Sequence, residues 1–440
     1  MMTTKESGAD GVIEMLQPSP VPNNPCLDYL PVWNGFDDAM DRLTVEPIRL
    51  GNGRMESDGV ANFPTSVQAH LTRAIVEAMF FSALERNPAD FEYQRLMFNA
   101  SAVLAETEDC HGHAISTKAI SVRNDGARGI FVFMPAEMGQ DTLVKAIEDY
   151  VGTESKWFYV NTPHRGQIEV NKVKSLTVRF PPNGSPKRFV KTLLHAIDTA
   201  AQTGYANETT GPFHRLPDEC AFAMCALCIR HNIGVILVPD ITAKALEQSG
   251  ASVLLGELSQ FAKLSGVPLV CLGSTGAASR LVELGATASS LYSKGGVSIA
   301  ALELEEAQWG LWTEYLWDNY LRFVFNHVMP DWLHKELWNH SRGHTEVATK
   351  LVRHIYERRE LNAGEELTPE RLSSFAEQAL KLERAPLRAV AHVRANRPTA
   401  RDGALRYADW IPLDTSIMAI PAVNESYSGS LFLPLIGEAS

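Results

Sequence analysis

The hydrophobic pattern of this chain changes character near residue 129. Before that point, apolar positions at helical spacing predict a helix from about Ser66 to Glu85 and a second one from Asp90 to about Ala105. After it, short apolar runs alternate with helical segments, a pattern typical of a parallel sheet with helical crossovers. We therefore expect an α/β fold.

The expected elements of the α/β part follow one another closely. Strands are predicted at 129–134, 175–180, 234–238 and 268–272, with helices at 141–150, 186–202, 217–231 and 251–265. After Gly273 the pattern is helical, with an aromatic-rich stretch over 305–328 and further helices near 344–359 and 368–382. Aromatic residues at this density indicate either a buried core or a protein contact surface, and we favour the core. Beyond Ala385 the pattern loosens.

A candidate phosphate-binding loop joins the first predicted strand to its helix. The nucleotide-binding pattern G-x-x-x-x-G-K-[ST] would lie over residues 134–141. Its second glycine, Gly139, is present, whereas Met134 replaces the first glycine. Gln140 replaces the lysine, and Asp141, followed by Thr142, replaces the magnesium-binding hydroxyl. Taken alone, the segment is also compatible with a strand–turn–helix that never bound phosphate.

The charges of this loop oppose phosphate binding. The lysine charge is missing, and Glu137 and Asp141 add two negative charges. A carboxylate about 4 Å from a phosphate would cost on the order of 4 kcal/mol at an effective dielectric constant near 20. We therefore expect no nucleotide cofactor.

Composition limits the classes of partner and compartment. A net charge of −12 argues against nucleic-acid binding driven by overall charge, although a local basic surface is compatible with it. No apolar run approaches the roughly 18–20 residues that a membrane span needs, and the N-terminus lacks the features of a signal peptide. Six cysteines in 440 residues indicate reduced thiols. We expect a cytoplasmic protein without membrane contact.

Four smaller groups are further candidate sites. Lys187, Arg188 and Lys191 are candidate DNA contacts, or part of a solvated face, within a basic stretch that also holds Lys172, Lys174 and Arg179. Cys110-His-Gly-His113 lacks the second ligand pair of a zinc site. Cys220, Cys225 and Cys228 on one predicted helix are more typical of core packing. Leu431–Ile436 is similar to a docking peptide.

Several stretches, taken in order, resemble the TnsC/TniB family of AAA+ regulators of transposition. They are Phe63-Pro-Thr-Ser66, Arg86-Asn-Pro88 with Glu92-Tyr93, Val178–Ser185, Gly266–Thr275, and Ser341-Arg-Gly-His344 with Ala348-Thr-Lys-Leu351. The resemblance covers about residues 60–395. It implies the AAA+ order of phosphate loop, acidic motif, polar sensor and helical lid.

The resemblance locates a second degraded motif. In that family Asp-Glu follows four apolar residues, whereas Gly234–Val238 is followed here by Pro239 and Asp240. Aligned without a gap, Pro239 takes the position of the magnesium-binding aspartate and Asp240 that of the catalytic glutamate. With a shift of one, Asp240 is the metal ligand and Ile241 takes the glutamate position. Either way one carboxylate is missing. The sensor position, Ser274 or Thr275, keeps a hydroxyl.

What the resemblance implies is a non-hydrolysing AAA+ adaptor in DNA transposition. Its expected partners are transposase subunits, a TniQ/TnsD-type target selector and double-stranded DNA, with assembly as a homo-oligomer or with an active AAA+ paralogue. The expected parts are an N-terminal arm (1–60), a helical extension (61–128), an AAA+ α/β core (129–300), a helical lid (301–395) and a C-terminal docking tail (396–440). Two alternatives stay open: an active ATPase in which Asp141 and Asp240 hold magnesium for ATP, and a scaffold outside transposition on the same inactive core.

Overall fold

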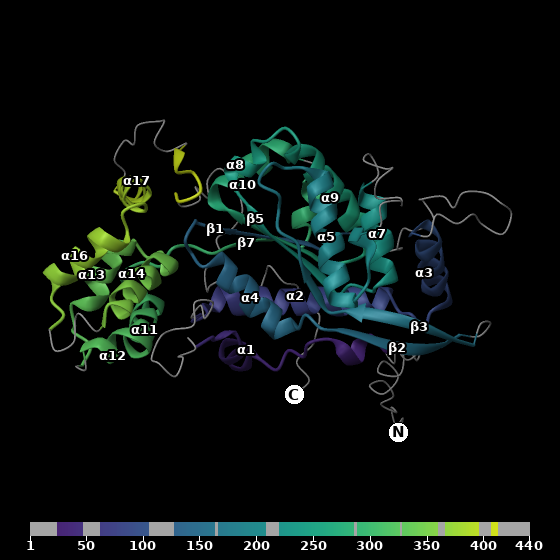
Figure 1. The fold of residues 1–440 in the computed structure, drawn as a ribbon, viewed down its shortest axis with the longest axis horizontal. Coiled ribbons are helices and arrows are strands. Elements are labelled where there is room, and N and C mark those ends of the chain that lie inside the picture. The colour runs from purple at the N-terminus through teal and green to yellow at the C-terminus, as the bar shows by residue number, and fades with distance from the viewer. Residues whose placement is uncertain are drawn as a thin grey trace, which may run out of the picture.

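A five-stranded parallel sheet lies at the centre of the molecule (Figure 1). The computed structural model describes residues 24–46, 62–104, 127–162, 166–207, 220–285, 288–325, 328–359, 366–395 and 406–411. The strand order is β4-β5-β6-β1-β7. These strands are β1 (Gly129–Met134), β4 (Ser175–Thr177), β5 (Val235–Ile241), β6 (Leu269–Ser274) and β7 (Gly296–Ser298). Helices cover both faces of the sheet, so the predicted α/β fold is confirmed.

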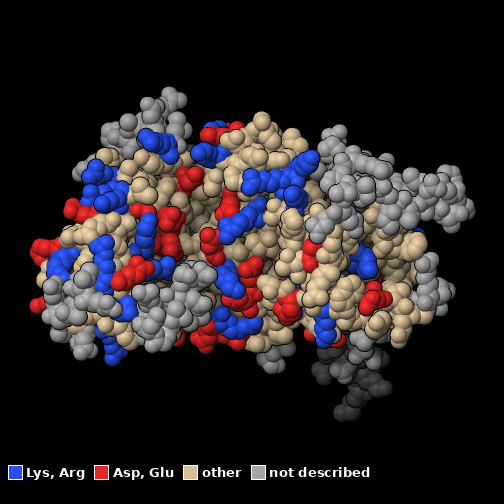
Figure 2. Space-filling model, in the orientation of Figure 1, with Lys and Arg blue, Asp and Glu red and all other residues tan. Residues whose placement is uncertain are grey.

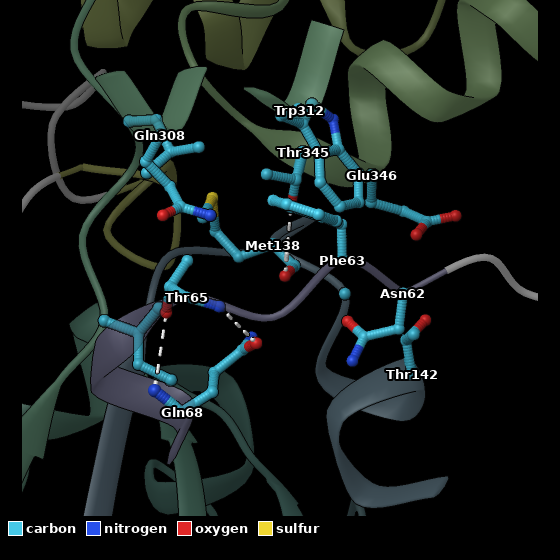
Figure 3. A pocket seen from close by; sticks show the side chains of 13 residues that line it. Asn62, Phe63, Thr65, Gln68, Met138, Thr142, Gln308, Trp312, Thr345 and Glu346 are labelled. Atoms are coloured by element: carbon cyan, nitrogen blue, oxygen red, sulfur yellow. Dashed lines mark hydrogen bonds between the residues drawn. The ribbon is translucent and has the colours of Figure 1, made fainter. Parts of the chain in front are cut away.

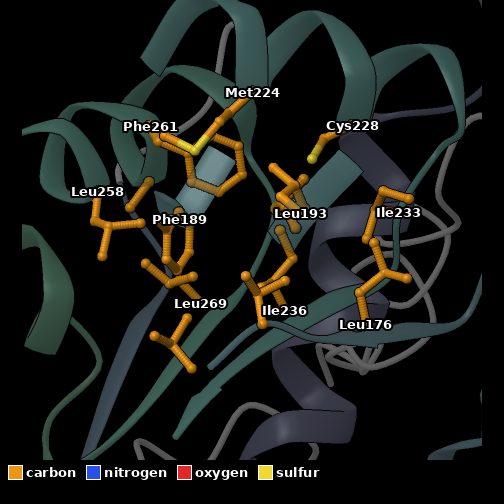
Figure 4. Packing of buried hydrophobic residues seen from close by; sticks show 14 of the residues in the cluster. Leu176, Phe189, Leu193, Met224, Cys228, Ile233, Ile236, Leu258, Phe261 and Leu269 are labelled. Carbon is orange, nitrogen blue, oxygen red and sulfur yellow. The ribbon is translucent and has the colours of Figure 1, made fainter. Parts of the chain in front are cut away.

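One face of the sheet is covered by α5 (Pro186–Ala201), α7 (Cys220–Arg230) and α9 (Ala251–Ser265). A further helix, α3 (Phe91–Leu104), packs on α7. Figure 4 shows Phe189, Met224 and Phe261 between these helices and the strands. Cys225 and Cys228 are fully buried in the same cluster, so core packing is confirmed for these two cysteines.

The opposite face is covered by α1 (Phe36–Leu43), α2 (Ser66–Glu85) and α4 (Gln140–Val151). Thr65 caps α2 in a capping box with Gln68, as its position before the apolar run predicts. All six residues of β1 are buried, with Ile130 and Val132 on this face and Phe131 on the other. Burial on both faces is typical of a central strand in a parallel sheet.

The C-terminal helices gather at one end of the molecule and enclose a core of their own (Figure 1). They are α11 (Ala307–Leu316), a π-helical turn (Trp317–Leu321), α12 (Arg322–Phe325), α13 (Leu333–Ser341), α14 (Thr345–Glu357), α16 (Pro369–Ala379) and α17 (Arg384–Arg394). Trp309, Trp312 and Tyr320 are buried, so the core interpretation of the aromatic stretch is confirmed. The loosening expected beyond Ala385 is wrong: α17 continues to Arg394, because Pro386 lies in its first turn, where proline is tolerated.

A β-hairpin at the other end of the molecule was not predicted. It consists of β2 (Ser155–Thr162) and β3 (Gly166–Val173), paired antiparallel. β4 is shorter than expected, and β5 is longer because an irregularity between Val238 and Ile241 shifts its register against β6. The remaining short elements are η2 (Leu27–Tyr29), η4 (Tyr205–Asn207), α8 (Ala243–Leu246), α10 (Thr275–Leu284) and η6 (Ser289–Tyr292). Within the described ranges, no helix combines the length and the hydrophobicity needed to cross a bilayer.

Candidate functional site

The predicted site residues meet at the carboxyl edge of the sheet. β6 lies between β1 and β5, and Met134 at the end of β1 is in register with Ser274 at the end of β6. Asp240 lies near the end of β5, one residue before Ile241, which is in register with Gly273 of β6. Ligands of open parallel sheets bind outside the carboxyl ends of the strands, so this edge is the candidate site.

The loop between β1 and α4 keeps the shape of a phosphate-binding loop but not its chemistry. α4 begins at Gln140, directly after Gly139, whose φ of 79° is readily adopted by glycine. Met134, by contrast, is only 1% exposed and belongs to the core below the sheet. The first glycine position has therefore become a packing position.

Arg179 lies between Asp141 and Asp240, the two candidate magnesium ligands of the sequence. Its guanidinium contacts Asp141 Oδ1 at 2.7 Å and Asp240 Oδ2 at 2.8 Å. These are the residues at the hydroxyl position of the loop and at the acidic motif. Since hydrogen bonds to both carboxylates favour the charged guanidinium, the pKa of Arg179 is raised, with Asp240 as the larger cause. One permanent cation thus pairs with both carboxylates and offsets one of their two negative charges.

The side chain of Gln140 is hydrogen-bonded to the end of β5, the strand that carries Asp240. Its side-chain Oε1 accepts a hydrogen bond from the Asp240 N–H at 3.1 Å. Asp240 itself has a φ of 70°, which turns its backbone toward the loop. The carbonyl of Pro239 accepts from the N–H of Phe180 at 2.9 Å. The side chain that replaces the lysine is therefore engaged inside the protein.

The N-terminus of α14 supports the loop from the side of the helical domain. The Ala136 carbonyl accepts from His344 Nδ1 at 2.9 Å, and the Glu137 carbonyl accepts from the Glu346 N–H at 3.1 Å. The Thr345 hydroxyl donates to the Met138 carbonyl at 3.2 Å. Burial lowers the pKa of His344 to about 4, so the ring is neutral at pH 7, with its proton on Nδ1. The N-terminus of α14 thus holds the loop through three hydrogen bonds.

Acidic side chains surround the loop on this side. Burial is the main cause that raises the pKa of Glu137 and of Glu346. The nearby charges of Glu137 and Asp141 raise the pKa of Glu346 further. The Glu346 carboxylate lies 3.8 Å from the position that a Cβ at Gly139 would take. A phosphate at this loop would therefore meet three carboxyl groups.

A small cavity lies between the loop and the helical domain (Figure 3). Phe63, Met138 and Trp312 line it, together with Thr142 and Glu346. Its volume of about 20 Å³ is enough for one water molecule. Pockets for small organic ligands measure roughly 300–1,000 Å³. The cavity beside the loop is therefore far smaller than a site for a small organic ligand.

The end of β6, with the candidate sensor residues Ser274 and Thr275, contacts a part of the chain that lies more than 100 residues later. The Thr275 hydroxyl lies 3.2 Å from the carbonyl oxygens of both Ala408 and Asp409. The Ser274 hydroxyl donates to the Asp409 carboxylate, and the Asp409 carbonyl accepts from the Ala136 N–H at 2.7 Å. Residues 406–411 of the predicted tail thus occupy the candidate site.

The basic residues that lie close together in the sequence differ in exposure in the structure. Lys187, Arg188 and Lys191 lie exposed together on the outer face of α5. Lys172 is buried, while Lys174 pairs with Glu154. Figure 2 shows basic and acidic side chains interspersed over the face in view. The basic surface available to DNA on this stretch is therefore limited to the three residues of α5.

ATP and magnesium, which the AAA+ resemblance implies, do not fit the residues present. Arg179 bridges the two candidate magnesium ligands, and the neighbouring cavity has room for about one water molecule. Outside this site, no group of three potential metal ligands is found among the described residues. Cys110–His113 and Leu431–Ile436 lie outside the described ranges.

Three residues of this site were not predicted from the sequence: Arg179, His344 and Asp409. Arg179 was noted only as part of a basic stretch, although it comes two residues after β4, which pairs with the acidic strand β5. His344 belonged to a stretch of the family resemblance, but nothing indicated its contact with the loop. No local signal marks Asp409, which lies 135 residues from Ser274. No model of a known protein family matches this chain, and no curated protein matches it either.

Proposed function

We propose that this chain is a non-hydrolysing, AAA+-like adaptor whose nucleotide site is filled by its own residues. The parallel sheet, with loop, acidic strand and sensor strand at one edge, is consistent with an AAA+-like core. The observation that carries the proposal is the contact of Arg179 with both Asp141 and Asp240. Phosphoryl transfer needs an exchangeable metal and positive charge at the phosphates, and here the side chain of Arg179 pairs with both candidate metal ligands.

The role in transposition rests on the resemblance of the sequence stretches to the TnsC/TniB family. Under this proposal the chain links transposase subunits, a TniQ/TnsD-type target selector and duplex DNA, as a homo-oligomer or together with an active AAA+ paralogue. The exposed basic residues of α5 are the proposed DNA contact. An adjacent gene for an integrase-type transposase would support this role over that of a scaffold outside transposition.

One observation favours the alternative of an active ATPase. Asp141 and Asp240 come close enough to contact the same guanidinium, so two hard oxygen ligands already face one point. For ATP hydrolysis, Arg179 would have to leave this point and magnesium would have to replace it.

Calorimetry of the full chain with ATP and ADP, each with and without magnesium, decides between the two. We expect no binding up to millimolar nucleotide. Micromolar, magnesium-dependent binding that is lost in Asp141→Ala would overturn the proposal in favour of the active ATPase. Asp331→Ala, which removes an exposed carboxylate in the helical domain, is the matched control.

A further inference from the structure

The segment of residues 406–411 is held at the candidate site by contacts to three separate elements. The loop after β1 donates the Ala136 N–H to its backbone, and the start of α10 contributes the Thr275 hydroxyl. The start of α8 donates the Ala243 N–H to Asp409 Oδ1 at 2.9 Å. These contacts are to both the backbone and the side chain of the segment, as in the recognition of a peptide ligand.

The Asp409 carboxylate lies at a pair of helix starts. Oδ1 accepts from the Ala243 N–H in the first turn of α8 and from the hydroxyl of Ser274, which also caps α10. Both groups donate hydrogen bonds, so the site favours an acceptor, and a carboxylate accepts more strongly than a neutral group does.

The surface under the segment is shaped to admit it. A Cβ atom at Gly276 would lie 2.7 Å from Asp409 Oδ1 and 2.9 Å from the carbonyl carbon of Ala408. These separations are too short for any side chain, so the absence of a Cβ at this position allows the segment to approach. Gly276 does not have a positive φ, so its backbone does not itself require glycine.

Trp410 extends the contact from the core to the helical domain. Its ring centroid lies 5.4 Å from that of His344, and it packs against the hydrophobic core of the C-terminal helices. At the same time, Asp409 contacts the α/β part of the molecule through Ala243 and Ser274. Two adjacent residues therefore join both parts of the molecule across the candidate site.

We propose that this edge is a peptide-binding site that recognises an aspartate followed by a tryptophan. Its occupant is the chain's own segment 406–411, which a partner segment of the same chemistry can displace. Through Asp409 and Trp410, the bound segment joins the α/β core to the helical domain, in addition to the direct hydrogen bonds of α14 to the loop after β1. The inference rests on the proposed absence of nucleotide, because a nucleotide would compete for the same edge.

A labelled peptide of residues 404–413, added to the full-length chain, tests the site. In wild-type chain the attached segment competes at an effective concentration in the millimolar range, which masks the site. Asp409→Asn weakens the attached segment, so this variant should bind the peptide roughly tenfold or more tightly than wild type does. Fluorescence anisotropy gives both affinities. A peptide with asparagine in place of the aspartate should bind more weakly, and Asp331→Asn should behave as wild type.

The receptor side gives an independent test. Gly276→Ala in the Asp409→Asn chain should abolish peptide binding while circular dichroism stays unchanged, since the added Cβ meets the peptide. Equal peptide binding to the wild-type, Asp409→Asn and Gly276→Ala chains, or none to any of them, would overturn the inference. Nucleotide binding is measured on the same samples without peptide. Binding of ATP would contradict the proposed function, whereas failure of the peptide alone would contradict only the site.

Discussion

Arg179 is a covalently attached cation that pairs with both Asp141 and Asp240. Its side chain and both partner carboxylates are exposed by 39–70%, so the two ion pairs contribute little to stability. We expect Arg179→Ala to lower the free energy of unfolding by about 1 kcal/mol or less. The variant should also gain stabilisation from magnesium, because Asp141 and Asp240 then face each other without a cation. Thermal unfolding with and without magnesium measures both effects.

Arg280 offers a matched control for this substitution. Its guanidinium also contacts two exposed carboxylates, those of Glu247 and Glu283, at 3.0 Å each. Arg280→Ala should lower stability by a similar amount. If Arg179→Ala shows no response to magnesium, or if it unfolds the protein, Arg179 does not substitute for a metal ion.

Lys172 is a buried cation without a carboxylate partner among the described residues. It is 1% exposed, and burial lowers its pKa to about 8 from 10.5. A lysine whose pKa is lower in the folded protein destabilises that state fully below pH 8, and the penalty disappears as pH rises to about 10.5. Lys172→Met should therefore raise the free energy of unfolding by up to about 3 kcal/mol at pH 7 and by little at pH 10.5.

Urea denaturation of the wild-type and Lys172→Met chains at both pH values measures this difference. Comparing two chains at each pH removes the contributions of other titrating groups. Lys187→Met, on the exposed face of α5, should change stability by less than about 0.5 kcal/mol at either pH. A gain that is independent of pH would contradict the buried-charge explanation.

Gly343, in the connection between α13 and α14, is the described glycine at which an added Cβ would come closest to another atom. Gly343 has a φ of 78°, and a Cβ there would lie 1.9 Å from the Leu302 carbonyl oxygen. Gly343→Ala should therefore destabilise the protein by more than about 2 kcal/mol. Gly310, inside α11, has open space at its Cβ position. Gly310→Ala should stabilise by about 0.5–1 kcal/mol, since glycine weakens helix interiors. Urea denaturation tests both, and equal effects would contradict the geometry.

The accuracy of sequence prediction differs between elements for physical reasons. β1 and α9 have the predicted bounds because continuous apolar runs and helical periodicity are local signals. The hairpin β2–β3 was missed because β3 changes from exposed to fully buried along its length, without alternation. At the site, the loop was predicted from its spacing and the acidic motif from the family resemblance. The contacts of Arg179 and Asp409 join residues 38 or more positions apart, and no local pattern encodes them.

For the whole molecule, the net charge of −12 makes any binding of DNA a local property. If α5 contacts the phosphate backbone, changing Lys187, Arg188 and Lys191 together to glutamine should weaken binding uniformly across sequences. It should also reduce the slope of log affinity against log salt by about 1 per residue in contact. Anisotropy at several salt concentrations measures this slope. Lys335→Gln, on α13, is the control, and an unchanged slope would identify the basic face as merely solvated.

The long separation between Ser274 and Asp409 has a consequence for biosynthesis. The two residues lie 135 positions apart, and a ribosome adds roughly 5–20 residues per second. Asp409 is therefore made roughly 7–27 s after Ser274. Until then the chain's own segment cannot occupy this sheet edge, so a partner present at the ribosome meets no competitor for the contacts of Ser274 and Ala243. In the finished chain a partner has to displace the segment first, so the order of synthesis favours assembly during translation.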